Sequence, residues 1–301
     1  MRISKINKNI YIQTQKPQNN TTIPLKKTYC DSISFTSNDF EKSFRSLAKN
    51  LISYAYLNNQ PREKEIAKIF KEFCPKSTFK QTQRIQAQNS DVISYSGNTE
   101  KEYTIRQDFL GRKKAILKKQ EISVIFPKDS SQKERIIFIG RLIHEGTHAL
   151  QAESPKKETE LDVINNFLKK ERNLQTIKSN ILSAFNFYET LSVELLGAIN
   201  EAFEESLSDI SSADEACRNY FSATIEEITY ELIQETMGNL GKNINLNFIF
   251  EYCKKVAQCE IEAYSKEKDF LKKANCSYEA NQAQIKIDAN KAIICAIESL
   301  Q

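Results

Sequence analysis

The chain of 301 residues is poor in the residues that break helices and in the residues that titrate near neutral pH. It contains seven glycines, six prolines and two histidines. No run approaches the roughly 20 apolar residues of a membrane-spanning helix, so no membrane span is expected. Basic residues at the N-terminus have no apolar segment behind them, which excludes an ordinary cleavable secretory signal. We expect a cytoplasmic protein, or one exported without such a signal.

The cysteines are odd in number and form no CxxC pair, which argues against a disulfide scaffold and against a cysteine zinc site. We expect most of them to be small apolar core residues, kept reduced in the cytoplasm. They are Cys30, Cys74, Cys217, Cys253, Cys259, Cys276 and Cys295.

Neither sign of charge dominates the chain. It has 43 Lys and Arg against 39 Asp and Glu, a net charge of +4, and the basic residues are scattered. No concentrated positive stripe favours phosphate binding, so nucleic acid is not an expected partner. Hydrophobic residues make up 40% and charged residues 27%, which is typical of a folded globular protein.

The first 38 residues are rich in Asn, Gln, Thr, Ser and Lys and lack periodic hydrophobicity. This composition predicts a flexible leader at 1–38, followed by one catalytic domain at 39–301. Such a leader would suit a dedicated export machine, although leaders of this kind are more often plain flexible tails.

Periodicity and turn residues predict the elements of the first half. Helices are expected at about 40–56 and 62–73, and strands at Val92–Gly97 and Ile122–Phe126. Asp129-Ser130-Ser131 offers caps for a helix that runs on to Leu150.

Helix breakers nearly disappear from the second half. After Pro155 only Gly197, Gly238 and Gly241 remain, and helical periodicity continues with a break near Gly238–Gly241. The predicted fold class is therefore α+β, mostly α, with a small sheet before the central helix and a helical lobe at the C-terminal end.

The predicted central helix contains His144-Glu145-Gly146-Thr147-His148. Histidines four positions apart lie on one face of a helix, so both rings can bind one metal ion while Glu145 addresses a water on it. Such a motif also arises by chance, as a pair of surface or core histidines. Against chance, the chain's two histidines both lie in the motif, the adjacent residues are uncharged, and a strand precedes the helix.

At these residues the sequence resembles the zincin (HExxH) metallopeptidases, from about Glu121 to Gln151 and in one later helix. The resemblance implies a Zn²⁺ cofactor bound by His144 and His148, Glu145 as general base, and hydrolysis of a protein or peptide substrate. The longer metzincin pattern is absent because the chain has no third histidine. The third ligand must then be a carboxylate, which makes the resemblance gluzincin-like.

Three later carboxylates compete for the third position. Glu205 begins a segment similar to the ExxxD signature of gluzincins, Glu201 fits ExxxE variants, and Glu260 fits an ExEA form of the ligand helix. Helix phase places Glu201 opposite the apolar side of its helix and Glu205 on the polar flank. Glu260 falls at the centre of an apolar stripe that also carries Glu267, whereas Glu262 falls on the polar side.

A carboxylate at the centre of an apolar stripe needs a cation, so Glu260 is the favoured ligand, with Glu205 and Glu201 as alternatives. The alternative to a metal ligand is that Glu260 forms a buried salt bridge to Lys or Arg. Tyr264, one turn later, is a candidate to hydrogen-bond a ligand or the oxyanion. The rival functions are a catalytically silent zincin-like module and a helical protein-interaction module in which the motif is accidental.

Overall fold

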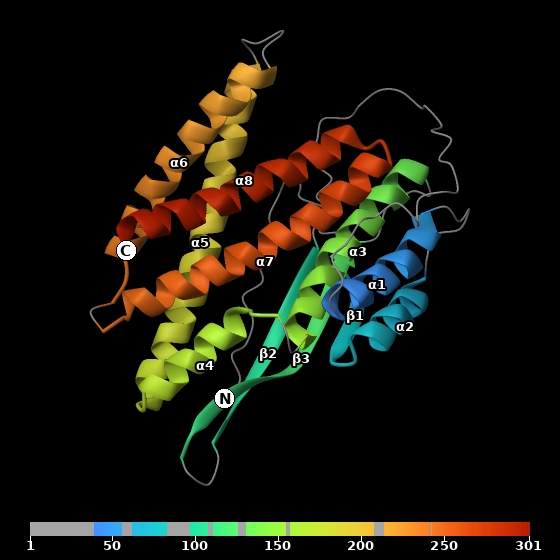
Figure 1. Ribbon diagram of the computed structural model, residues 1–301. Helices are drawn as coiled ribbons and strands as arrows, with labels where there is room; N and C mark the ends of the chain where they lie inside the picture. Colours follow the sequence, from blue (N-terminus) through green and yellow to red (C-terminus); the bar gives the residue numbers. More distant parts are fainter. Residues whose placement is uncertain are drawn as a thin grey trace. The chain divides into compact units, whose positions relative to one another are not determined.

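The computed structural model divides the chain into two compact units (Figure 1). Unit 1 comprises residues up to Thr104, then Ile116–Lys157 and Glu262–Ala283; unit 2 comprises Ile105–Ala115, Glu158–Ile261 and Gln284–Gln301. The structure describes residues 39–55, 62–82, 97–107, 111–125, 131–154, 157–207, 214–241 and 243–301. The leader predicted at 1–38 lies outside these ranges, and the predicted single domain at 39–301 stays a prediction.

Within the described ranges the fold is α+β and mostly α, as predicted. The helices are α1 (Asp39–Ala55), α2 (Glu63–Phe73), α3 (Gln132–Glu153), α4 (Glu160–Lys170), α5 (Leu174–Leu207), α6 (Asp214–Gly238), α7 (Leu246–Lys273) and α8 (Ser277–Leu300). The strands are β1 (Ser77–Thr82), β2 (Gly97–Gln107) and β3 (Lys113–Ile125).

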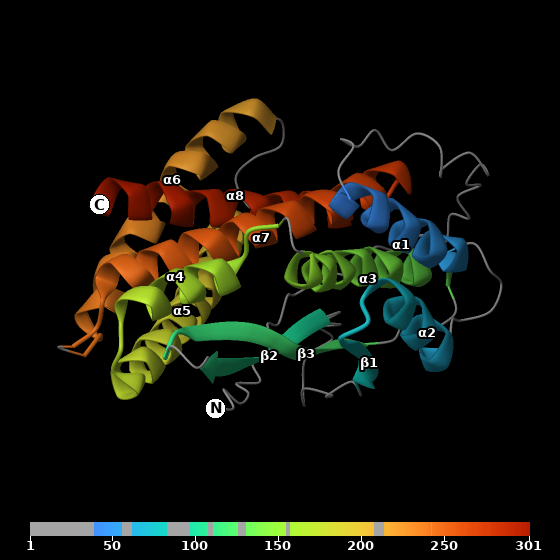
Figure 2. The ribbon, with the colours of Figure 1, turned by 60° about the horizontal axis from the view of Figure 1, so that its bottom comes forward.

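Unit 1 places α3 against a small mixed sheet of order β1-β3-β2 (Figure 2). β1 runs parallel to β3, with Ser77 opposite Gln120. The buried Gln120 amide joins the sheet to α3 by donating to the Ala149 carbonyl at 3.0 Å. The Glu153 carboxylate, at the end of α3, accepts from the backbone N–H of Lys76 at 3.0 Å. These bonds fix α3 over one face of the sheet.

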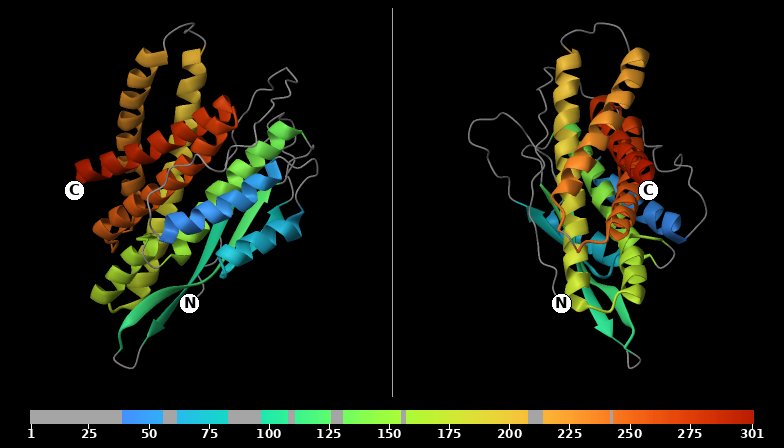
Figure 3. Two further views of the ribbon diagram at one scale, coloured as in Figure 1. Left: turned by 45° about the vertical axis from the view of Figure 1, so that its right-hand side comes forward. Right: turned by 90° about the vertical axis from the view of Figure 1, so that its left-hand side faces the viewer.

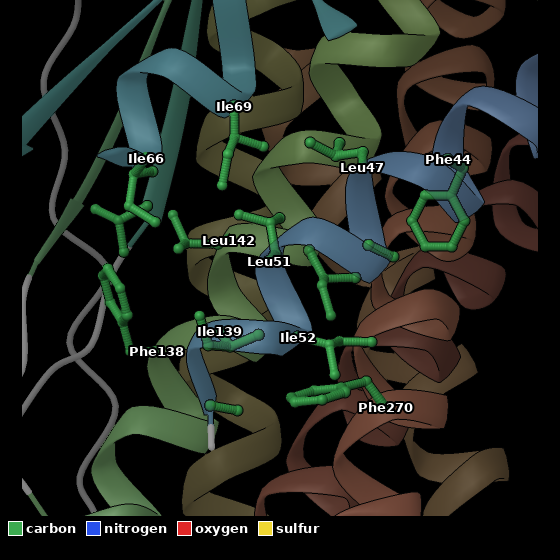
Figure 4. Close-up of a cluster of buried hydrophobic side chains, with 14 of the residues drawn as sticks. Phe44, Leu47, Leu51, Ile52, Ile66, Ile69, Phe138, Ile139, Leu142 and Phe270 are labelled. Carbon is green, nitrogen blue, oxygen red and sulfur yellow. The ribbon is translucent and has the colours of Figure 1, made fainter. Parts of the chain in front are cut away.

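The other sides of α3 are covered by α1, α2 and α7, which form the apolar core of unit 1 (Figure 4). Leu47 and Leu51 of α1, Phe70 of α2 and Ile139 of α3 are wholly buried, and Phe270 of α7 is nearly so. A helix covered on every side is expected to be apolar all round. The polar residues of α3 are therefore the exceptions that need partners.

The predicted helices of the first half are confirmed, but the strands differ. Ser131 caps α3 by accepting from the N–H of Glu134 at 3.2 Å. The predicted strand Val92–Gly97 lies outside the described residues except for Gly97, which begins β2. β3 is longer than predicted and starts at Lys113, while β1 was not predicted, because its sequence STFKQT lacks a run of β-branched residues.

Unit 2 contains α4, α5, α6, the first half of α7 and most of α8, together with the adjoining ends of β2 and β3 (Figure 3). Thr159 and Asp162 form a capping box at the start of α4. α5 and α6 pack against each other, and the gap between α6 and α7 falls at the predicted break near Gly238–Gly241. None of the described helices is both long and apolar enough to cross a membrane.

Four of the described cysteines, Cys74, Cys253, Cys259 and Cys276, are buried free thiols, as predicted, whereas Cys295 is exposed. The side chains of Cys30 and Cys217 lie outside the described part. Burial raises the pKa of Cys74 to about 12 and that of Cys276 to about 11. Both thiols are therefore protonated near neutral pH.

Gly146 lets α1 and α2 approach α3. A Cβ at this position would lie 2.8 Å from Cδ2 of Leu47 and 3.2 Å from Cε1 of Phe70. We expect Gly146→Ala to lower the free energy of unfolding by about 1–3 kcal/mol through overpacking. The control is Gly197→Ala on α5, where nothing lies within 4 Å, and it should gain about 0.5–1 kcal/mol. Denaturant melts measure both; equal effects would contradict the packing argument.

Candidate metal centre

The polar side chains of HEGTH lie inside unit 1. His144 is 5% exposed, Glu145 4% and His148 7%, while Thr147 is fully buried and donates to the Ile143 carbonyl at 2.8 Å. Buried polar groups without partners are costly, so each of these side chains should be matched by a group from another element or by an ion. The partners of each side chain therefore define what the site can do.

The two imidazoles converge. Nε2 of His144 lies 3.2 Å from Nε2 of His148, and the rings meet nearly edge to face with centroids 4.8 Å apart. Two nitrogens bound to one tetrahedral zinc, with Zn–N of about 2.0–2.1 Å, stand roughly 3.3 Å apart. The observed separation therefore suits a shared metal ion.

The partner of Nδ1 of His148 fixes which nitrogen of that ring carries the proton. Nε2 of Gln151 donates to Glu262 at 2.8 Å, so its Oε1, 3.1 Å from Nδ1 of His148, is an acceptor. Nδ1 of His148 must therefore donate, and its Nε2 carries the lone pair when the ring is neutral. Nδ1 of His144 lies 3.3 Å from the Glu267 carboxylate without hydrogen-bond geometry, so this contact does not set the tautomer of His144. The lone pair on Nε2 of His148 faces Nε2 of His144, which can either donate a hydrogen bond to it or share a cation with it.

Glu260, the carboxylate favoured from helix phase, joins the two histidines. Ligand atoms of His144, His148 and Glu260 all lie within 4.8 Å of one another, and Glu260 is half-buried. Glu260 lies on α7, two positions before the segment of unit 1 that begins at Glu262. The same unbroken helix carries Tyr264 and Glu267, and it therefore sets the position of Glu260. The structure thus brings together the three residues predicted to bind metal.

Glu267 supports this site from the next turns of α7. It is 2% exposed, and besides its contact with His144 it pairs with Nη1 of Arg141 at 2.9 Å. Burial lowers the pKa of Arg141, but the Glu267 carboxylate and other nearby groups raise it above its usual value, so its charge persists. Gly140 allows this approach, because a Cβ there would lie 3.2 Å from Leu271 and 3.7 Å from Glu267. Glu267 therefore contacts both a candidate metal ligand, His144, and a basic residue, Arg141.

Glu262, which helix phase places on the polar side of its helix, is bonded to two other polar side chains. Its carboxylate is 23% exposed and accepts from Gln151 and from Nζ of Lys157, the latter at 2.7 Å. Lys157, Glu262 and Gln151 thus form a row of hydrogen-bonded side chains that ends at Nδ1 of His148. The end of α3 and the segment after it therefore contact this polar side of α7.

Glu145 is held by the edge strand β2. The Thr99 hydroxyl donates to Oε2 of Glu145 at 2.7 Å and also lies 3.4 Å from its backbone carbonyl. Among the described residues, no other donor to this carboxylate is found. The strand nearest to Glu145 is thus β2 and not β3, the strand that directly precedes α3 in sequence, because β3 occupies the centre of the sheet.

Tyr264 packs its ring against His144, with centroids 4.2 Å apart and planes tilted by 48°. The ring covers one side of the imidazole and limits its rotation. The role proposed for the Tyr264 hydroxyl, bonding a ligand or the oxyanion, stays a prediction.

The donor set fits zinc better than it fits a harder cation. Two imidazole nitrogens with one carboxylate, each histidine backed by a carboxylate or an amide, is typical of catalytic zinc sites with one open position. Calcium and magnesium prefer all-oxygen sets. The competing carboxylates Glu201 and Glu205 lie on α5, but their side chains are outside the described part.

A comparison with models of known protein families found no match, and comparisons with curated proteins and with solved structures found none either.

Zinc affinity tests the third ligand. We expect Glu260→Gln to weaken zinc binding strongly because it removes the charge that balances the ion, whereas Glu201→Ala and Glu205→Ala should leave affinity near the wild-type value. Glu251→Gln is a matched control, since Glu251 lies on the same helix and is half exposed beside Lys254. Mass spectrometry measures the zinc content of each variant, and competition with a chelator measures its zinc affinity. Loss of zinc in Glu205→Ala, but not in Glu260→Gln, would move the ligand to α5.

The contact between Glu267 and His144 generates a further prediction. Glu267→Gln should weaken zinc binding by about 10–100-fold, because groups that orient a histidine ligand typically have effects of this size. Glu279→Gln is the control, since Glu279 pairs with Lys133 at 3.0 Å elsewhere in unit 1. Chelator competition measures both variants. Equal affinities in the two variants would show that Glu267 only stabilises the fold.

Proposed function

We propose that the protein is a zinc-dependent metallopeptidase of gluzincin-like type. The observation that carries the proposal is the convergence of the two Nε2 atoms at 3.2 Å with a carboxylate of Glu260 in reach. Beside them lies the buried carboxylate of Glu145. Ligands and a general base in this combination support hydrolysis, not merely metal storage.

In this proposal His144, His148 and Glu260 hold the zinc ion. When bound, zinc would polarise a substrate carbonyl and lower the pKa of water to about 7. The tautomer favoured by Gln151 prepares His148 for this role, because it leaves Nε2 free of a proton, and the Glu267 carboxylate lies 3.3 Å from Nδ1 of His144.

Glu145 is the proposed general base. Thr99 holds one carboxylate oxygen at 2.7 Å, which orients the side chain and leaves the other oxygen to take a proton from the attacking water. The same carboxylic acid then returns the proton to the leaving amine. Burial strengthens this step, because charge interactions are larger where water is excluded.

The substrate proposed is an extended peptide lying along β2. Within the described sheet β2 is at an edge, and edge strands present backbone groups that can pair with an added strand. Thr99 lies on this strand and touches Glu145, so a peptide paired with β2 would pass close to the general base.

The test combines metal content with turnover. The protein and its Glu145→Gln variant are loaded with zinc and incubated with unfolded casein. We expect one zinc per chain in both proteins, cleavage by the wild type, and a fall in cleavage of at least about 100-fold in the variant, the size typical of a lost general base. Chelation should abolish cleavage, and added zinc should restore it.

Each other outcome selects a different function. Zinc bound without cleavage of casein or of a peptide library would favour a catalytically silent zincin-like module. Absence of stoichiometric zinc would favour a helical interaction protein. Cleavage that persists in Glu145→Gln would overturn the role of Glu145 while leaving the metal site intact.

A further inference from the structure

We propose that Glu262 is a positioning residue of the metal centre. Acting through Gln151, and held by Lys157, it keeps the proton of the neutral His148 ring on Nδ1 and so leaves Nε2 free for a metal ion. This inference rests on the proposed function, in which His148 is a metal ligand. All four residues lie in unit 1.

The four side chains form a row that runs from the surface of unit 1 to the imidazole. Nζ of Lys157 donates to Oε1 of Glu262 at 2.7 Å, and the amide nitrogen of Gln151 donates to Oε2 of Glu262 at 2.8 Å. The amide oxygen of Gln151 lies 3.1 Å from Nδ1 of His148. The exposed fraction falls from 30% for the Lys157 side chain to 1% for Gln151. The bond that reaches the imidazole is therefore shielded from water.

The outer end of the row sets the direction of every bond in it. An ammonium group donates and cannot accept, and a carboxylate accepts and cannot donate. Each oxygen of Glu262 therefore accepts one bond, and Gln151 has to turn its amide nitrogen towards Glu262. Its oxygen then faces His148, so Nδ1 has to carry the proton. An amide alone could present either of its ends to the ring, and the carboxylate decides which.

Phe40 holds Lys157 in place. Nζ of Lys157 lies 4.5 Å from the centroid of the Phe40 ring, which is the range of a cation–π contact. Phe40 belongs to the first turn of α1 and is 3% exposed, so its ring is a fixed surface. An ion pair near the surface is weak by itself, and the ring gives Lys157 a second contact. The start of α1 therefore supports the row from outside the metal centre.

An amide in place of the Glu262 carboxylate reverses the row. In Glu262→Gln, Lys157 still needs an acceptor and takes the new amide oxygen. The new amide nitrogen then replaces Oε2 and faces the amide nitrogen of Gln151, which has to turn over. Gln151 now donates to Nδ1 of His148, so the proton of the neutral ring moves to Nε2, where it competes with a metal ion.

Removing Lys157 as well restores the original direction. In the double variant Lys157→Met with Glu262→Gln, the new amide no longer has to offer its oxygen to an ammonium group. It can rotate and accept from Gln151, which then presents its own oxygen to His148 again. The methionine keeps an apolar side chain against the Phe40 ring.

Zinc affinity tests the inference. Glu262→Gln should bind zinc about 10–100-fold more weakly than the wild type, the size typical of a lost partner of a histidine ligand. The double variant should bind zinc about tenfold more tightly than Glu262→Gln alone. A residue that only stabilised the fold would give the opposite order, because the double variant loses more contacts. Chelator competition measures the affinities, and denaturant melts measure the stabilities.

Nitrogen NMR of the zinc-free proteins reads the proton position directly, under conditions in which the rings are uncharged. The chain has two histidines, so a spectrum of His144→Gln assigns both rings. We expect the proton of His148 on Nδ1 in the wild type and in the double variant, and on Nε2 in Glu262→Gln. One proton position in all three proteins would overturn the inference. Absence of zinc from the wild type would instead overturn the proposed function, and the spectra would still decide the proton position.

Lys133 and Glu279 give the matched control, because their side chains pair at 3.0 Å elsewhere in unit 1. Glu279→Gln, alone and combined with Lys133→Met, should leave the zinc affinity and both proton positions unchanged. If this control pair changed them as much as the variants of Glu262 do, loss of any such ion pair would disturb the site, and the inference would fail.

Discussion

The structure of unit 1 depends on the burial of polar side chains along α3. A helix enclosed by a sheet and three other helices leaves no water for His144, Glu145 or His148, so every partner has to come from protein or from a bound ion. β2 supplies Thr99 and α7 supplies Glu267. Because each partner comes from a different element, the buried polar groups also specify how those elements pack.

The central helix and the convergence of its two histidines could be predicted because the information is local. Ser131 caps the helix, and the spacing of His144 and His148 defines one face. Glu260 was reached by a weaker argument, from its phase on an otherwise apolar stripe, and the structure brings it to the histidines. Phase works when one side of a helix is uniformly apolar, since a single acid on that side is then conspicuous.

The supporting residues could not be predicted because their contacts are long-range. Thr99 lies on β2 beyond the predicted strand Val92–Gly97, and nothing in its neighbours marks it as a partner of Glu145. Glu267 and Arg141 are 126 positions apart. Helix phase placed Glu262 on the polar side of α7, but phase alone does not reveal its partners Gln151 and Lys157.

The discontinuity of unit 1 constrains when it can fold. Its last segment, Glu262–Ala283, follows an intervening stretch of unit 2, and Lys266 in that segment pairs with Glu41, 225 positions away. A nascent chain therefore displays the HEGTH helix long before α7 leaves the ribosome. Until then His144 and His148 lack Glu260 and Glu267, and a prematurely terminated chain would carry the motif without the assembled donor set. Synthesis itself therefore delays the completion of unit 1 until residue 283 has been passed.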